Sequence, residues 1–138
     1  MNITVQYVEP MYVHQVWPEV KVFIEAAVKQ GLGEYSADNV RAELADGIQT
    51  LFLAIKENKI AGCCTVKLCN VPQHRIAYIT SYGGKGITSA EVFGYVEKWC
   101  LSMGATKIQA YAKEAQMRLY KKALGFSAPC YVVEKNYA

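Results

Sequence analysis

The segment from Tyr82 to Thr88 places three glycines and a lysine directly before a predicted helix. It reads YGGKGIT and follows a β-prone run that ends at Ser81. Its glycines allow positive φ angles and close backbone approach, and the first-turn amides of a helix lack intrahelical partners. Such N–H groups bind phosphate, and Lys85 would add a positive charge. The segment therefore predicts an anion site, with an ordinary strand-to-helix turn as the open alternative.

The spacing of Thr88 and Glu91 is that of a capping box, which predicts a helix starting at about Thr88 with its positive end toward the glycines. No GxGxxG or GxxxxGK[ST] spacing is present. The segment is therefore neither a dinucleotide fingerprint nor a P-loop.

Length and composition favour one domain over residues 1–138, since 52% of the 138 residues are hydrophobic. The five cysteines form no CxxC pair, so we expect no disulfide framework and no metal site. A net charge of +3 is too small to indicate nucleic acid, although basic residues gather in the last third of the chain. No leader or membrane-length apolar run is evident, so we expect a soluble cytoplasmic protein.

Hydrophobic periodicity predicts ten elements in the order β, α, α, β, β, β, α, β, α, β. The first helix is expected over residues 17–31, with Pro18 in its first turn. Ser36 is the expected N-cap of the second helix, and Gly47 its end. The remaining predicted elements are a hairpin of residues 50–55 and 60–68, a strand over 76–81, the helix ending at Gly104, a strand at KIQAYA, a helix over 116–124 and a closing strand at PCYVVEK.

This order resembles the GNAT superfamily of acyl-CoA-dependent N-acyltransferases over essentially the whole chain. ENKIAG at residues 57–62 resembles the turn between the family's second and third strands, and ALGF at 123–126 the end of its last helix. The resemblance implies an α/β (α+β) fold, with a mixed, mostly antiparallel sheet of about six strands and helices on both faces. Trp17–Pro18, residues 35–38 and the GG loop also resemble GNAT-like proteins of tailed bacteriophages, whose location would be the host cytoplasm.

The resemblance implies acetyl-CoA as co-substrate. In the family, a loop of Gln or Arg, two variable residues, Gly, one variable residue and Gly or Ala holds the pyrophosphate, and the preceding strand pairs with pantetheine. Gly84 and Gly86 stand at the two small positions, whereas Ser81 stands where Gln or Arg is expected. The implied cofactor-binding residues are Ile79, Thr80, Ser81, Gly83, Gly84, Lys85, Gly86, Ile87 and Thr88.

The acid–base residues depart further from the family pattern. Family members often carry a tyrosine four residues before the Gly of LGF, where it protonates the departing thiolate; that position is Lys121 here, and Tyr120 is one residue away. One residue is about 100° around a helix, so Tyr120 is either a packed core residue or the acid. Tyr120 and Lys121 are the catalytic candidates, and no general base is evident. Glu34 and Tyr35 fall where the family borders its acceptor site.

Two functions remain open. The first is an acetyl-CoA-dependent N-acetyltransferase that modifies a primary amine of a small molecule or protein by direct attack. The second is a non-catalytic GNAT-like phage protein that binds a host protein or sits in a virion, motivated by Ser81 and Lys121. Nucleic-acid binding ranks below both, and a homodimer is one of the oligomeric states left open.

Overall fold

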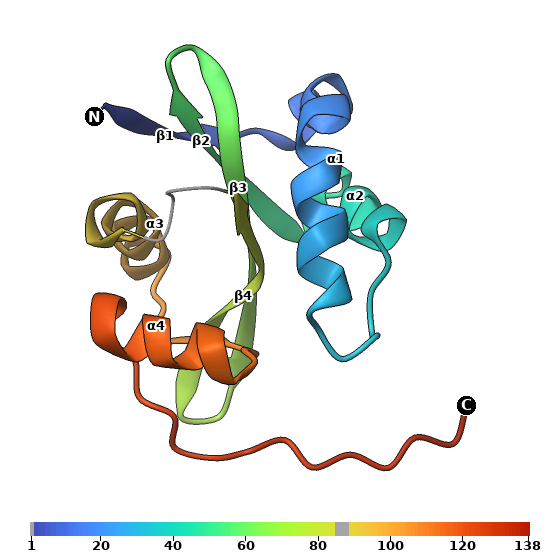
Figure 1. Ribbon diagram of the computed structural model, residues 1–138, viewed down its shortest axis with the longest axis vertical. Coiled ribbons are helices and arrows are strands. Elements are labelled where there is room, and N and C mark those ends of the chain that lie inside the picture. Colours follow the sequence, from blue (N-terminus) through green and yellow to red (C-terminus); the bar gives the residue numbers. More distant parts are fainter. Residues whose placement is uncertain (1, 85–88) are drawn as a thin grey trace.

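The computed structural model describes residues 2–84 and 89–138 (Figure 1). Its elements are β1 (Ile3–Val8), η1 (Pro10–Tyr12), α1 (Val13–Lys29), α2 (Ala37–Ala45), β2 (Gln49–Lys56), β3 (Lys59–Val71), β4 (His74–Gly84), α3 (Ala90–Ser102), β5 (Lys107–Ala110) and α4 (Glu114–Leu124). Within these residues, no helix is long and apolar enough to cross a membrane.

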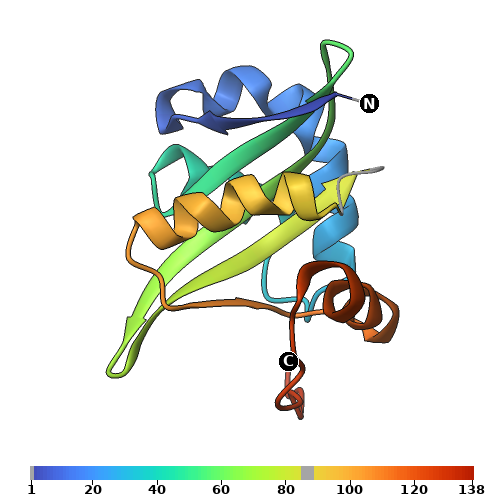
Figure 2. The same cartoon turned by 90° about the vertical axis from the view of Figure 1, so that its left-hand side faces the viewer.

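The strands form one sheet in the order β1-β2-β3-β4-β5. The first four strands pair antiparallel with their neighbours, and β5 pairs parallel to β4. Helices α1 and α2 cover one face of the sheet, while α3 lies on the other face with α4 on the same side (Figures 1 and 2). The predicted mixed, mostly antiparallel sheet with helices on both faces is confirmed.

A tight turn at Glu57 and Asn58 joins β2 to β3, as the sequence predicts. Both residues have positive φ, 53° and 61°. Two successive left-handed residues are typical of a type I′ turn, whose twist matches that of the strands it joins. This hairpin aligns β3 with β2, and β3 in turn pairs along most of β4.

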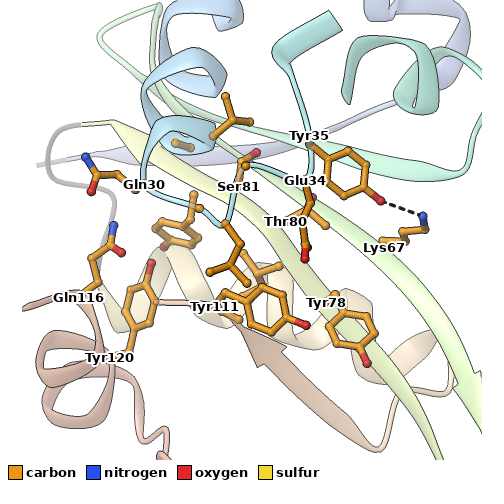
Figure 3. Close-up of a pocket in the computed structure, with 18 of the residues that line it drawn as sticks. Gln30, Glu34, Tyr35, Lys67, Tyr78, Thr80, Ser81, Tyr111, Gln116 and Tyr120 are labelled. Carbon is orange, nitrogen blue, oxygen red and sulfur yellow. Dashed lines mark hydrogen bonds between the residues drawn. The ribbon is translucent and has the colours of Figure 1, made fainter. Parts of the chain in front are cut away.

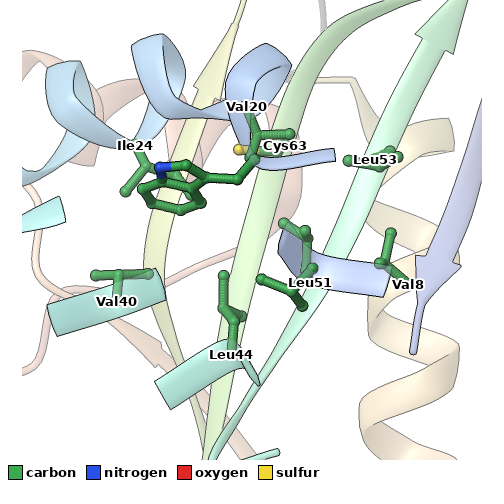
Figure 4. Packing of buried hydrophobic residues seen from close by; sticks show 10 residues of the cluster. Val8, Val20, Ile24, Val40, Leu44, Leu51, Leu53 and Cys63 are labelled. Atoms are coloured by element: carbon green, nitrogen blue, oxygen red, sulfur yellow. The ribbon is translucent and has the colours of Figure 1, made fainter. Parts of the chain in front are cut away.

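The core between the sheet and the first two helices is built mainly from aliphatic side chains (Figure 4). Trp17, Val20 and Ile24 recur at helical spacing on α1 and are at most 3% exposed. They pack with Leu44 of α2 and Leu53 of β2 in one cluster. This packing orients the C-terminal end of α1 over β3 and β4.

Helix α1 begins at Val13, one turn before the predicted start, so Pro18 lies at its sixth position rather than in its first turn. Proline has no N–H, so the carbonyl of His14 loses its usual donor four residues later, at a cost of about 3 kcal/mol. Burial of Val13 and Trp17, at about 1.5–3 kcal/mol for each large apolar side chain, offsets that loss. Tertiary packing therefore sets the start of the helix.

The opposite face of the sheet carries an aromatic and thiol-rich core under α3. Phe52 meets Trp99 edge-on at 5.1 Å between ring centroids. Cys64, Val96 and Cys100 complete this cluster. The two cores hold the sheet from both sides. Helix α4 lies where β4 and β5 separate.

The predicted closing strand is wrong. Residues 125–138 form neither helix nor strand, and the sheet has five strands instead of about six. The run PCYVVEK is β-prone, but a strand needs a partner, and in this chain the run pairs with none of the described strands.

The first two glycines of YGGKG do not begin a loop as expected. Gly83 and Gly84 are the last residues of β4 and pair with Cys63 and Gly62. Only Gly84 of the two has positive φ, 126°, and a Cβ there would lie 2.4 Å from the carbonyl oxygen of Ala61. Glycine is therefore required at 84 by the neighbouring strand. The prediction for Lys85, Gly86, Ile87 and Thr88 lies outside the described residues.

The N-cap of α3 is Ser89, and the helix begins at Ala90 rather than at about Thr88. The Ser89 hydroxyl accepts a hydrogen bond from the amide of Val92 at 3.2 Å. The sequence has two adjacent hydroxyl residues that could cap this helix, Thr88 and Ser89. The capping-box spacing to Glu91 favoured Thr88, whereas Ser89 is the cap.

Candidate functional site

Strands β4 and β5 pair over four residues and then separate. The parallel ladder joins Ile76–Ile79 to Lys107–Ala110, while β4 continues to Gly84. On its other side, β4 carries a bulge: Ser81 lies opposite Thr65 and Ile79 opposite Val66, which leaves Thr80 as the extra residue. A bulge bends its strand and increases the local twist. The edge of β4 beyond Ile79 therefore has no β5 partner.

A pocket of ≈ 320 Å³ lies at this separation (Figure 3). Its walls come from five parts of the chain: the end of α1 with the loop that follows, β3, β4, the end of β5 and α4. The polar side chains that line it are Gln30, Glu34, Tyr35, Lys67, Tyr78, Thr80, Ser81, Tyr82, Tyr111, Gln116 and Tyr120. The volume lies within the range of small-molecule sites.

Tyr120 lines the pocket, and its carbonyl closes the last turn of α4. The amide N–H of Gly125 donates to the carbonyl of Tyr120, five residues earlier, and Phe126 donates to the same carbonyl at 3.3 Å. An α-helical bond spans four residues, so this turn accommodates one extra residue. The tyrosine that precedes LGF by one residue more than in the family still faces the pocket (Figure 3).

The ring of Tyr120 is packed as well as lining the pocket. It lies 6.3 Å from the ring of Tyr82 and 5.8 Å from that of Phe126. Burial, with a smaller contribution from Cys64, raises the pKa of Tyr120 above its ordinary value. The hydroxyl therefore keeps its proton at neutral pH. Lys121, by contrast, is exposed and is not among the described residues that line the pocket.

A chain of hydrogen bonds runs through the sheet beside the pocket. The amide nitrogen of Gln49 donates to the Glu43 carboxylate at 3.1 Å, and the Gln49 carbonyl accepts from the Thr80 hydroxyl. The hydroxyl of Thr65 lies 2.7 Å from that of Thr80 and also bonds Ser81. Gln49, Thr65 and Ser81 are at most 5% exposed.

The direction of this chain follows from the carboxylate at its end. A carboxylate only accepts, so Gln49 must present its NH₂ to Glu43 and its oxygen to Thr80. Thr80 then donates to Gln49, Thr65 to Thr80 and Ser81 to Thr65. With its proton given to Thr65, the Ser81 hydroxyl can act only as an acceptor toward the pocket that it lines.

Lys67 is held by the same carboxylate. Its ammonium lies 3.2 Å from both Glu43 and the hydroxyl of Tyr35. The bond to Tyr35, together with Glu43, raises the pKa of Lys67 and outweighs the effect of burial. Because Glu43 neutralises this ammonium, Glu34 is the remaining charged side chain among the described residues that line the pocket.

The structure brings together most of the sequence-predicted site residues that it describes. Ile79, Thr80, Ser81, Glu34, Tyr35 and Tyr120 all line the pocket. Gly83 and Gly84 lie beyond it, at the end of β4.

The sequence analysis missed Lys67, Gln49 and Thr65. One signal for them was available: each is a polar residue within a strand that otherwise reads as apolar. Partners for such residues lie on other elements, and strand periodicity does not identify them.

The cysteine thiols of the core are not suited to act as nucleophiles. Burial raises the pKa of Cys63 to about 12 and that of Cys100 to about 11, and the pKa of Cys64 is also raised by burial. Thiols of this kind stay protonated and are poor nucleophiles. Among the described residues, no cluster of His, Cys, Asp or Glu could hold a metal ion.

The profile of the acetyltransferase (GNAT) family matches residues 16–126 of the sequence. The chain therefore belongs to this family. A search among curated proteins finds no match.

Solved structures of the same fold share little sequence with this chain. A predicted acetyltransferase from Clostridium acetobutylicum, solved with acetyl-CoA, superposes with a TM-score of 0.66 at 15% identity and covers 98% of this chain and 96% of its own. An aminoglycoside acetyltransferase from an uncultured soil metagenomic sample, solved with sisomicin, gives 0.72 at 14%, covering 99% and 95%. Glucosamine-6-phosphate N-acetyltransferase from Arabidopsis thaliana gives 0.66 at 14%, with both chains covered completely.

Proposed function

We propose that this protein is an acetyl-CoA-dependent N-acetyltransferase that acts on a cationic primary amine. The observation that carries the proposal is the position of the Tyr120 hydroxyl in a pocket at the point where β4 leaves β5. The family supplies the reaction class, and the residues of the pocket supply the individual roles.

The free edge of β4 fits the pantetheine arm of acetyl-CoA. Backbone groups of Thr80 and Ser81 face a gap that no described strand fills, and an extended amide-containing chain can pair there as a strand does. The Ser81 hydroxyl adds an acceptor for an N–H of the ligand. Ile79, Thr80 and Ser81 are the proposed pantetheine contacts, and Gly83 to Thr88 remain the proposed pyrophosphate segment.

Acetyl-CoA supplies an activated acyl thioester. The amine first loses one proton to water, its neutral nitrogen then forms the new bond to the acyl carbon, and the carbon–sulfur bond breaks. Tyr120, which holds its proton at neutral pH, gives that proton to the leaving sulfur and takes one back from solvent water before the next turnover. Lys121 is the weaker candidate because it lies outside the pocket.

The acceptor side is formed by the loop after α1. Glu34 lines the pocket and has no ion-pair partner among residues 2–84 and 89–138, so its charge is available to an ammonium group. The hydrogen bond from Lys67 positions Tyr35, which lines the pocket next to Glu34. We propose these two residues as the acceptor site, with water taking up the proton that the amine releases.

Calorimetric titration with acetyl-CoA tests the cofactor half of the proposal. Ala110 lines the pocket where the two strands part, whereas Ala112 does not line it. Ala110→Trp should weaken binding at least tenfold by filling the gap, and Ala112→Trp should leave it unchanged. No heat of binding at millimolar acetyl-CoA would refute the proposal.

Release of free CoA thiol with a panel of amines tests the acceptor half. Glu34→Gln should raise KM for cationic amines about tenfold and leave the Kd of acetyl-CoA unaltered, because one exposed charge contributes on the order of 1 kcal/mol. Equal KM values for the two proteins across the panel would remove Glu34 from the acceptor site.

The non-catalytic alternative has less support. It was motivated by Ser81 and Lys121, whereas Ser81 and Tyr120 both line the pocket and support the catalytic proposal. None of the comparisons above supports a phage origin.

A further inference from the structure

Lys67 lines the pocket, but its ammonium is paired with a carboxylate that lies outside the pocket. The Nζ atom lies 3.2 Å from Oε1 of Glu43 on α2, and 3.2 Å from the Tyr35 hydroxyl (Figure 3). Glu43 is not among the described residues that line the pocket, whereas Lys67 and Tyr35 both are. A residue outside the pocket therefore sets the charge that Lys67 presents inside it.

The Glu43 carboxylate is also held in place from a second side. The same Oε1 atom accepts a hydrogen bond from Nε2 of Gln49 at 3.1 Å, and Gln49 is only 1% exposed. Gln49 is in turn fixed by the hydroxyl of Thr80, which donates to its side-chain carbonyl. An ion pair between two freely moving side chains contributes little, because holding both of them costs entropy. In this pair, one partner is already held by a buried side chain.

The ion pair is partly withdrawn from water. The side chain of Lys67 is 33% exposed and that of Glu43 is 25% exposed. Salt screens partly buried charges less than fully exposed ones. Loss of either charge would therefore change the electrostatic potential in the pocket instead of being cancelled by ions from the solvent.

Neutralisation of Lys67 matters because a carboxylate lines the same pocket. That carboxylate belongs to Glu34. While Glu43 pairs with Lys67, Glu34 is the charge that a ligand of the pocket meets, and a positively charged ligand is favoured. Without Glu43, the ammonium of Lys67 would offset Glu34 and would attract anionic groups instead.

We propose that Glu43 is a positioning residue that sets the charge preference of the acceptor site through Lys67. Its carboxylate holds and neutralises the ammonium, so the site takes amines that carry a further positive charge in preference to amines that carry a carboxylate. Glu43 itself contacts neither the acceptor nor the reacting atoms. The inference rests on the acetyltransferase function proposed above and names the class of amine that this function would use.

Glu43→Gln tests the charge alone, because the glutamine oxygen can still accept hydrogen bonds from Gln49 and Lys67. The matched probes are a linear alkyl diamine and the amino acid of the same chain length, in which a carboxylate replaces the second ammonium. The ratio of kcat/KM for the diamine to that for the amino acid should fall about tenfold, because the two opposite probe charges both respond to the unpaired ammonium. A general loss of activity or stability lowers both values and leaves their ratio unchanged.

A second substitution shows whether the effect passes through Lys67. Lys67→Met in the Glu43→Gln background removes the ammonium, so the ratio should return toward the wild-type value. A structural defect caused by Glu43→Gln would not be reversed by a further change in the pocket wall. Asp46→Asn is the control, because Asp46 is an exposed carboxylate that does not line the pocket, and it should leave the ratio unchanged.

Calorimetric binding of the two probes in the presence of free CoA gives the same comparison without turnover. A wild-type protein that binds the diamine but releases no CoA thiol from acetyl-CoA would refute the proposed function, and the binding ratio would still test Glu43. A ratio that Glu43→Gln does not change, or that stays low in the double variant, would overturn the role of Glu43. A wild-type protein that binds neither probe, or that prefers the amino acid, would overturn it as well.

Discussion

Gly125 donates its amide N–H to the carbonyl of Tyr120, five residues earlier, and thereby closes a turn one residue wider than an α-helical turn. Gly125 has φ of 74°, which glycine adopts readily. The same helix end places Phe126 beside the Tyr120 ring, 5.8 Å between centroids. Tyr120 lines the pocket although it precedes LGF by one residue more than the family pattern has.

Replacing Tyr120 by Phe removes the proposed acid and keeps most of the ring packing. We expect kcat to fall by roughly 10²–10⁴-fold, the usual contribution of a general acid, with little change in the Kd of acetyl-CoA. Steady-state kinetics and calorimetry on the same preparations measure the two effects. Lys121→Met is the matched control and should retain wild-type kcat. The reverse pattern would assign the acid to Lys121.

Thr65→Val removes the hydroxyl that joins Thr80 to Ser81 at almost constant volume. Thr65 is fully buried, so we expect a loss of about 1–3 kcal/mol in the free energy of unfolding. KM for acetyl-CoA should also rise, since the Ser81 hydroxyl loses its orientation. Thr50→Val on the neighbouring strand should change stability by less than about 0.5 kcal/mol. Urea unfolding of both variants measures these changes. Equal losses in the free energy of unfolding would argue against a special role for the chain of hydrogen bonds.

Stability should fall above pH 9 because of the buried Cys63 thiol. Burial raises its pKa from the ordinary 9.0 to about 12. Below pH 9 the thiol is protonated in both states. Between the two values only the unfolded chain loses the proton, which favours unfolding by up to about 1.4 kcal/mol per pH unit.

Cys63→Val removes this titration, so its unfolding free energy should decline less steeply than that of wild type between pH 9 and pH 11. Other buried thiols and tyrosines contribute to the decline in both proteins and cancel in the comparison. Parallel pH profiles in urea titrations would contradict the assignment.

Leu44→Ala tests the core between the sheet and the first two helices. Leu44 is 1% exposed and packs within the cluster of Figure 4. We expect a loss of about 2–5 kcal/mol, from lost transfer free energy and the cavity left behind. Ile48→Ala is a suitable control, since Ile48 is 51% exposed and should cost far less. Thermal or urea unfolding measures both.

Gly84→Ala and Gly94→Ala should have opposite effects. A Cβ at Gly84 meets the Ala61 carbonyl at 2.4 Å in a backbone conformation that disfavours side chains, so this variant should be strongly destabilised. A Cβ at Gly94 meets nothing within 4 Å, and alanine in a helix interior is worth about 0.5–1 kcal/mol over glycine. A tolerated alanine at 84 would show that β3 can move aside.

Local patterns in the sequence determined most of the fold. Alternation in Ile3–Val8, the cap at Ser36 and the turn at Glu57 and Asn58 each depend on neighbours within a few residues. The order of elements led to the family, and the family led to the predicted pocket residues on β4 and after α1.

Only the tertiary structure decided what depends on distant contacts. Pro18 lies inside a helix because α1 is buried, and Gly84 is required because β3 passes close to it. The chain of hydrogen bonds from Ser81 to Glu43 joins residues far apart in sequence. The wide turn at Tyr120 depends on a backbone hydrogen bond. Spacing along the sequence specifies side-chain direction within one element, whereas these features depend on the packing of several elements together.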